Sequence, residues 1–179
     1  MRNVFSRCRM LFLFFGLLFT FETFAVNGVK ELDYDQYIGT WYEIARFPNK
    51  HENGMVEVTS TFKRGKNGKY ELVNEGYKGS RNGKKTTVRG IVHIPDPNVD
   101  GDMKVRIWFF TIDYKVIDID RENYEYALVS SESDKYLWIF SKSPVMDEAV
   151  YEKLVESARE KGFDTDKLEM VPQSTGKNA

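Results

Sequence analysis

The side chains that most often carry catalysis or bind metals are few and widely separated in this sequence. Its two histidines, His51 and His93, have no partner at the spacing of metal ligands, and the one cysteine, Cys8, stands near the start. No Gly-x-Ser-x-Gly motif and no glycine-rich phosphate loop is present. We therefore expect no catalytic residue, no metal site and no cofactor, and an enzyme acting on lipids is the weakest alternative.

A few polar side chains could instead orient the head group of a bound molecule. Asn74 and several tyrosine hydroxyls stand within otherwise apolar segments. Glu43 alternates with Trp41, and if that face points inward an unpaired carboxylate there is costly, so we would then expect a cation or tyrosine partner or a turn toward the solvent. Arg46 and Lys50 could meet a phosphate or carboxylate, although a solvated surface position is the favoured interpretation.

The first 25 residues have the pattern of a secretory signal peptide. Arg2, Arg7 and Arg9 precede an apolar run from Met10 to Phe21, which is too short for a convincing membrane span. We predict cleavage after Ala25, with a signal peptide at 1–25 and one domain at 26–179; an uncleaved anchor is the alternative. Because Cys8 precedes the apolar run, it is badly placed for lipid attachment, and the mature chain would contain no cysteine.

The charge balance argues against nucleic acid as a partner. The full chain has a net charge of −1, and residues 1–25 hold three arginines and one glutamate, a net +2, so residues 26–179 carry −3. This region is long enough to bury one hydrophobic core without disulfides.

Eight short segments of this region have the pattern of β-strands. The clearest is 103–110, in which Met103, Val105, Ile107 and Phe109 alternate with more polar positions. The other seven are 41–47, 55–64, 70–77, 86–94, 114–119, 124–130 and 136–141. Asn-Gly pairs at 67–68 and 82–83 predict tight hairpins with positive φ at the turn. The pattern predicts an all-β fold, an eight-stranded antiparallel up-and-down β-barrel, with the loops 48–54 and 78–85 at one mouth.

After the eighth segment the apolar period becomes helical. The stripe consists of Met146, Val150, Leu154, Val155 and Ala158. Lys161 and Gly162 end it in the way that a last-turn cation and a C-terminal glycine end a helix. We expect this α-helix to pack on the outside of the barrel, with a helix on a membrane surface as the alternative, and a short strand at 167–171.

Three segments resemble the signatures of the lipocalin family, in its bacterial lipocalin and apolipoprotein D branch. Residues 39–47 contain Gly-x-Trp as Gly39-Thr40-Trp41, residues 118–127 are similar to the second signature, and 136–144 to the third. The resemblance covers roughly 34–171. It gives structural roles to Gly39, Trp41, Asp120 and Lys142. The family usually has arginine at Lys142, whose ammonium can still make a cation–π contact with Trp41.

The resemblance implies a barrel floor at Trp41, and alternation along each strand then gives the inward positions. The ligand-binding candidates are Val58, Ser60, Phe62, Leu72, Asn74, Val88, Met103, Val105, Ile107, Tyr114, Val116, Val129, Tyr136 and Trp138. Small residues among large rings leave space beside an apolar wall, as in most small-molecule pockets. The outer-face residue Trp108 is expected to be covered by the C-terminal helix or to mark a contact surface.

The expected function is binding and transport or storage of a hydrophobic small molecule, a fatty acid or lysophospholipid, in the bacterial cell envelope. Burial of a sixteen-carbon chain could contribute on the order of 10 kcal/mol before ordering costs. We expect an exported monomer or weak dimer, periplasmic or secreted, and leave peripheral contact with the outer membrane open. The alternative is a protein-interaction module whose barrel is filled, which the volume inside the strands would distinguish.

Overall fold

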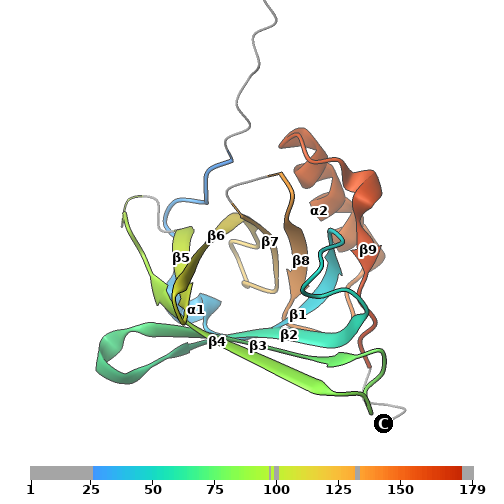
Figure 1. Ribbon diagram of the computed structural model, residues 1–179. Helices are drawn as coiled ribbons and strands as arrows, with labels where there is room; N and C mark the ends of the chain where they lie inside the picture. Colours follow the sequence, from blue (N-terminus) through green and yellow to red (C-terminus); the bar gives the residue numbers. More distant parts are fainter. Residues whose placement is uncertain (1–25, 97, 99–100, 132–133, 175–179) are drawn as a thin grey trace, which may run out of the picture.

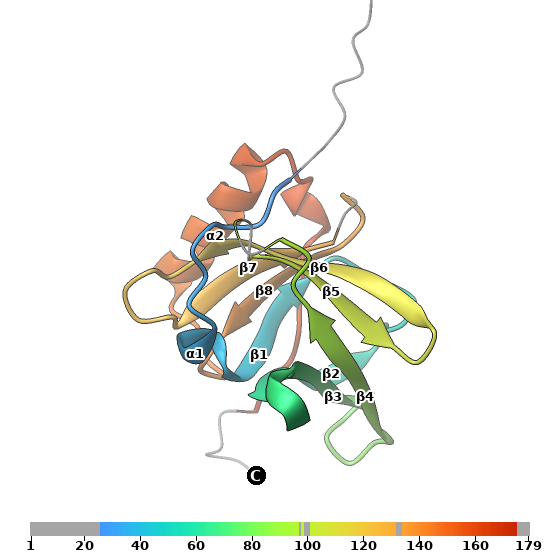
Figure 2. The same ribbon diagram turned by 90° about the vertical axis from the view of Figure 1, so that its left-hand side faces the viewer.

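The computed structural model describes residues 26–96, 98, 101–131 and 134–174. The predicted signal peptide, 1–25, lies outside the described residues. Figure 1 looks down the axis of a barrel, and Figure 2 shows the same molecule from the side. Among the described residues, no helix has the length and apolar character needed to span a bilayer.

Eight antiparallel strands form the barrel in sequence order. They are β1 (Gly39–Arg46), β2 (Met55–Arg64), β3 (Tyr70–Lys78), β4 (Lys85–His93), β5 (Asp102–Ile107), β6 (Phe110–Ile119), β7 (Tyr126–Ser130) and β8 (Leu137–Ser141). Strand β1 pairs with both β2 and β8, which closes the sheet on itself. The predicted eight-stranded up-and-down barrel is therefore confirmed, and we call its interior the lumen.

The two ends of the barrel differ. The ends of β1, β3, β5 and β7 and the starts of β2, β4, β6 and β8 lie at one end, the mouth, which faces the viewer in Figure 1. The short helix α1 (Tyr34–Tyr37) lies at the other end, the floor, and Asp33 caps its first turn through bonds from the backbone N–H groups of Asp35 and Gln36. The sequence prediction that loops 48–54 and 78–85 share one mouth is confirmed.

Three turns differ from the sequence prediction. At Asn82-Gly83 the predicted positive φ is absent, and residues 79–84 form a longer connection between β3 and β4. The expected two-residue turn at Asn67-Gly68 is a 3-10 helix, Lys66–Gly68, in which Gly68 has a φ of 73°. Strand β5 stops at Ile107 and β6 starts at Phe110, because Ile107 pairs directly with Phe110. The predicted segments 103–110 and 114–119 were therefore wrong at their mouth ends, and Trp108 and Phe109 form the turn.

One helix packs on the outside of the barrel, as predicted. Helix α2 (Glu148–Glu160) starts at its N-cap Asp147 and ends before Gly162, which has a φ of 88°. Leu154, Val155 and Ala158 pack against outward-facing residues of β1, β6, β7 and β8. The last strand, β9 (Glu169–Met170), pairs with the mouth end of β1. Inside the barrel, a separate cluster of buried residues surrounds Trp41 and Phe62.

Candidate functional site

The floor of the lumen is built on Trp41, which is completely buried. Its indole Nε1 donates to the backbone oxygen of Tyr37 at 2.9 Å, and the two rings lie 4.9 Å apart. Phe62 packs edge-on against Tyr37 at 5.0 Å between centroids. These rings close the lower end of the barrel, so a ligand must enter from the mouth.

Lys142 covers the outer face of the Trp41 ring. Its Nζ lies 4.1 Å from the ring centroid and donates to the backbone oxygens of Tyr37 at 3.2 Å and Ile38 at 2.8 Å. The predicted cation–π contact is present. Gly39 allows this approach because it has a φ of 121° and an added Cβ would lie 3.0 Å from the Lys142 Nζ.

Stability should depend on pH through Lys142. Burial lowers the pKa of this ammonium from its ordinary 10.5 to about 8. Between these values the unfolded chain binds a proton that the folded chain does not, so stability should rise with pH from about 8 to 10.5, and the cost of burying the charge is fully present below pH 8.

Comparison with Lys142→Arg isolates this contribution, because guanidinium remains charged over the whole window. We expect the free energy of unfolding of the natural chain to gain about 1–2 kcal/mol relative to Lys142→Arg between pH 7 and 10, after allowance for solvent screening. Urea unfolding at several pH values measures it. Parallel pH profiles for the two proteins would show that the Lys142 pKa is not lowered.

Asp120 organises the turn between β6 and β7 at the floor. Its carboxylate accepts from the backbone N–H groups of Glu122 at 3.2 Å and Glu125 at 3.3 Å. Tyr124, in this turn, has a φ of 54° and a buried side chain whose hydroxyl accepts from the backbone N–H of Asp33 at 2.9 Å. The turn therefore anchors the segment that leads into α1.

A line of polar groups rises from the floor through the lumen. The hydroxyls of Tyr37 and Tyr114 lie 2.9 Å apart, Tyr114 is hydrogen-bonded to Ser60, and the Ser60 hydroxyl donates to Asn74 Oδ1 at 2.9 Å. Burial raises the pKa of both tyrosines, so they are neutral at physiological pH. The line can therefore donate hydrogen bonds but supplies no charge of its own.

A buried ion pair lies higher on β1. Glu43 Oε1 accepts from Arg46 Nη1 at 2.9 Å, and the side chains are only 2% and 3% exposed. A β-bulge between Glu43 and Ala45 turns Arg46 onto the same face as Glu43, opposite Trp138. The expectation that Glu43 has a cation partner is thus met, whereas the favoured surface position for Arg46 was wrong.

The charges around this pair have opposite effects on the pKa of Glu43. Burial raises the pKa of Glu43, repulsion from Glu52 adds to the rise, and Arg46 offsets it. Arg46 is also held from the solvent side, since its Nε donates to Glu169 at 3.1 Å and its Nη2 donates to the backbone oxygen of Glu52 at 2.8 Å. The guanidinium thus ties β1, β9 and the loop 47–54 together.

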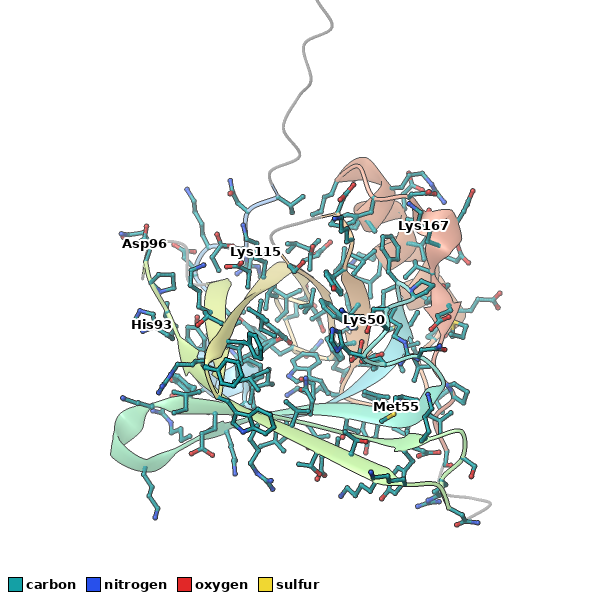
Figure 3. The ribbon with its side chains drawn as sticks, viewed as in Figure 1. Lys50, Met55, His93, Asp96, Lys115 and Lys167 are labelled. Carbon is teal, nitrogen blue, oxygen red and sulfur yellow. The ribbon has the colours of Figure 1, made fainter. Side chains whose placement is uncertain are left out.

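The loop 47–54 reaches across part of the mouth. Glu52 accepts from Trp138 Nε1 at 3.1 Å, and the Trp138 ring stacks on Tyr136 at 5.7 Å. Lys50 is exposed on this loop and is labelled in Figure 3, which looks into the mouth. A basic group and two partly exposed rings therefore stand where a ligand would enter.

The mouth half of the lumen is apolar and open to solvent. Val88 is 37% exposed although it shares the face of β4 that carries Val92 of the lumen core. Ile112 pairs with the buried Val105 and is 44% exposed. Solvent therefore reaches inward-facing apolar side chains on β4 and β6, which is the access that an apolar ligand needs.

Sequence reasoning missed two of these mouth residues. Ile112 was left between two predicted strands, and Phe110 was placed at the end of 103–110 with Phe109 as the inward residue, yet residues 110–116 alternate perfectly between apolar and polar positions. That alternation was the signal that could have placed both side chains on the inward face of β6. No comparable sequence signal marks the bulge that turns Arg46 inward.

The fourteen ligand-binding candidates differ in how deeply they are buried. Nine are buried: Val58, Ser60, Phe62, Leu72, Met103, Val105, Tyr114, Val116 and Val129. Four are partly exposed, Asn74, Ile107, Tyr136 and Trp138, and Val88 is exposed. The buried set packs largely against itself near the floor, so the residues best placed to touch an entering ligand are those toward the mouth.

Two further hollows lie outside the lumen. One, of about 470 Å³, runs between the start of α2 and the chain around β9, where Val145 and Met170 are exposed. The other, of about 330 Å³, lies beside the loop 47–54 and includes Lys50 and Glu169. Within the described ranges, no three histidine, cysteine or acidic side chains gather in a way that could hold a metal ion.

Comparison of the sequence with known proteins gives consistent matches. Residues 32–173 match the family described as "Lipocalin-like domain". The chain is 33% identical over 150 residues to outer membrane lipoprotein Blc of Vibrio cholerae, covering 83% of this chain and 87% of that protein. It is 37% identical over 158 residues to temperature-induced lipocalin-1 of Arabidopsis thaliana, covering 82% of each.

The fold is also similar to solved structures. The cockroach allergen Per a 4 superposes with a TM-score of 0.64 at 26% identity, covering 83% of this chain and 92% of that one. The residues that match the lipocalin-like family, 32–173, include all eight strands of the barrel and α2.

Proposed function

Because the chain belongs to the lipocalin family, in the branch that includes the bacterial Blc lipoproteins and apolipoprotein D, we propose that it binds and carries a fatty acid or lysophospholipid in its lumen. Lipocalins bind small hydrophobic ligands. The observation that carries the proposal is the apolar mouth half of the lumen, where Val88 and Ile112 face inward and are nevertheless exposed.

The lining of the site suits a long apolar chain. Packed rings close the floor around Trp41, while Trp138, Tyr136 and Ile107 line the wall above it and are only partly exposed. A flexible acyl chain can follow this apolar wall, and each buried methylene contributes about 0.8 kcal/mol. The Ser60–Asn74 pair offers polar contacts, and Lys50 stands near the entrance for an anionic head group.

We propose that this carrier works in the bacterial cell envelope. The predicted signal peptide supports export, and the similar protein of Vibrio cholerae is named an outer membrane lipoprotein. Nothing in the described site gathers residues in the pattern of a catalytic triad or metal centre, so we propose carriage or storage rather than turnover.

Mutation of the mouth tests the proposal. Val88→Glu places a carboxylate on the inward face of β4 and should weaken binding of hexadecanoate at least tenfold, because the acyl chain loses apolar wall and meets like charge. Ile91→Glu is the matched control: Ile91 lies on the outer face of the same strand and is also 37% exposed. It should leave affinity within about twofold, as expected of a surface substitution.

Binding is measured by native mass spectrometry and by saturable quenching of tryptophan fluorescence. Hexadecanoate and a sixteen-carbon lysophosphatidylcholine are the probes, and lysophosphatidylcholine binding alone would point to the phosphate-bearing class. Equal loss in both glutamate variants would place the ligand outside the lumen. Absence of any saturable binding would favour the filled-barrel interaction module, for which the packed floor is the supporting feature.

A further inference from the structure

Three adjacent aromatic side chains at the mouth are exposed, and two of them are the most exposed large apolar side chains among the described residues. Trp108 is 83% exposed, Phe109 81% and Phe110 59%, and we call these three residues the aromatic tip. The Phe109 and Phe110 rings lie 4.2 Å apart. Helix α2 does not cover Trp108, so of the two sequence interpretations the contact surface is the one that fits. Three adjacent exposed aromatic rings are costly in water and mark a surface that meets an apolar partner.

The residues of this turn are not those that favour its backbone conformation. Trp108 has a φ of 52°, the left-handed region in which a bulky residue is strained and glycine or asparagine is preferred. A Gly-Ser turn would join β5 and β6 with less strain. The chain instead has tryptophan and phenylalanine at this turn, and both side chains are exposed. This indicates that the two rings contact a partner and do not serve to stabilise the fold.

A strongly basic hairpin end shares this side of the molecule. Residues 76–92, which span the end of β3 and most of β4, contain Lys78, Arg81, Lys84, Lys85 and Arg89 and no acidic residue, although the whole chain has a net charge of −1. All five side chains are exposed, and one of them, Lys85, pairs with Glu75 at 3.0 Å. Figure 2 shows the β3–β4 and β5–β6 turns projecting away from α1.

Aromatic rings combined with basic side chains match the chemistry of a bilayer surface with anionic lipids. Tryptophan and phenylalanine settle at the boundary between head groups and acyl chains, and lysine and arginine are attracted to anionic head groups. We propose that the mouth of the barrel docks on an anionic membrane, with the aromatic tip inserted and the basic hairpin against the head groups.

The docked orientation connects with the lumen. Phe110 is both part of the tip and paired with Ile107 of the lumen wall, and Ile112 and Val88 continue the apolar surface inward. An acyl chain could then pass from the bilayer to the lumen along apolar side chains. This last consequence rests on the proposed function, whereas the docking itself does not.

Vesicle binding by the full-length mature chain tests the proposal. The probe is vesicles of phosphatidylcholine with about one-third phosphatidylglycerol, free of fatty acid, compared with vesicles of phosphatidylcholine alone. We expect partition into the anionic vesicles, at least a tenfold weaker partition into the neutral ones, and a blue shift of tryptophan emission from Trp108, which is now 83% exposed.

The variant Trp108→Gly with Phe109→Ser removes two rings of the tip and supplies a favoured turn, so it should fold at least as stably. Its partition into anionic vesicles should fall at least tenfold. Arg81→Glu with Lys84→Glu should reduce partition into anionic vesicles to the neutral-vesicle value. The matched control is Val145→Ser with Met170→Ser, which removes two side chains 56% and 62% exposed beside the outer hollow and should leave partition unchanged.

Each contrary result has a definite meaning. Full vesicle binding by the Trp108→Gly, Phe109→Ser variant would overturn the proposal, as would equal losses in the Val145→Ser, Met170→Ser control. A dimer in sedimentation that the tip variant converts to a monomer, without vesicle binding by either, would assign the tip to a second copy of the chain and likewise overturn it. Retained hexadecanoate binding without vesicle binding would overturn the docking proposal and leave the proposed function standing. Vesicle binding without any acyl binding would overturn the proposed function and leave the docking proposal standing.

Discussion

Replacing Arg46 by methionine should lower the free energy of unfolding by about 3–5 kcal/mol, because it leaves the Glu43 carboxylate buried without its counter-charge. Glu43 is only 2% exposed, and its bond from Arg46 is 2.9 Å long. Methionine keeps much of the volume of the arginine stem, so the loss reports the charge rather than a cavity. Urea unfolding of the natural chain and the variant measures it.

The double variant separates the pair from its parts. Glu43→Gln with Arg46→Met removes both charges from the lumen and should recover at least half of the loss, since a pair replaced by neutral groups is much less costly than one partner left alone. Glu169→Gln is the control: Glu169 contacts the same guanidinium but is 44% exposed, and its removal should cost less than about 1 kcal/mol. A double variant no more stable than Arg46→Met would show that Arg46 acts through its other bonds.

The pH dependence of Arg46→Met has a definite sign. Burial and Glu52 raise the pKa of Glu43, so the folded chain holds its proton to higher pH than the unfolded chain does. For such an acid, stability falls as pH rises from the unfolded value of 4.5 through the folded value. The variant lacks the offsetting cation, so its deficit should shrink toward pH 4.5, where a neutral acid is what the lumen buries.

The barrel could be predicted from the sequence because its physical causes are periodic and local. The alternation of apolar and polar residues along β5 and the apolar stripe of α2 each indicate which face is buried. Turn-forming residues mark most strand ends. The floor was predicted for a different reason: Gly39, Trp41 and Lys142 come from three separate segments, and only their resemblance to a known family brought them together before the structure did.

The mouth could not be predicted to the same depth because its features break those periods. A bulge between Glu43 and Ala45 puts Arg46 on the inner face, and a single extra residue in a strand has no compositional mark. The turn at Trp108 and Phe109 contains neither glycine nor asparagine, so the rules that locate hairpins placed it inside a strand. Both irregularities, the bulge beside Arg46 and the turn at Trp108, lie at or near the mouth.

Loss of the floor ring should be as damaging as loss of the buried pair. Trp41→Ala removes a side chain that is completely buried, and we expect a loss of about 3–5 kcal/mol. Trp41→Phe keeps a ring but loses the bond to the Tyr37 backbone oxygen, so about 1–2 kcal/mol is expected. Urea unfolding measures both, and equal losses would mean that the cavity matters less than the indole N–H.

The same two variants measure how far Lys142 depends on the ring. Its Nζ lies 4.1 Å from the Trp41 centroid, so Lys142→Met should cost less in the Trp41→Ala background than in the natural chain, with a coupling of about 0.5–2 kcal/mol. A coupling near zero would mean that the two backbone oxygens at the end of α1 hold the ammonium without help. The expected coupling would instead show that the Trp41 ring and the Lys142 ammonium stabilise the floor together. Their contacts with the backbone at the end of α1 hold that helix across the floor. The mouth then remains as the route by which a ligand reaches the lumen.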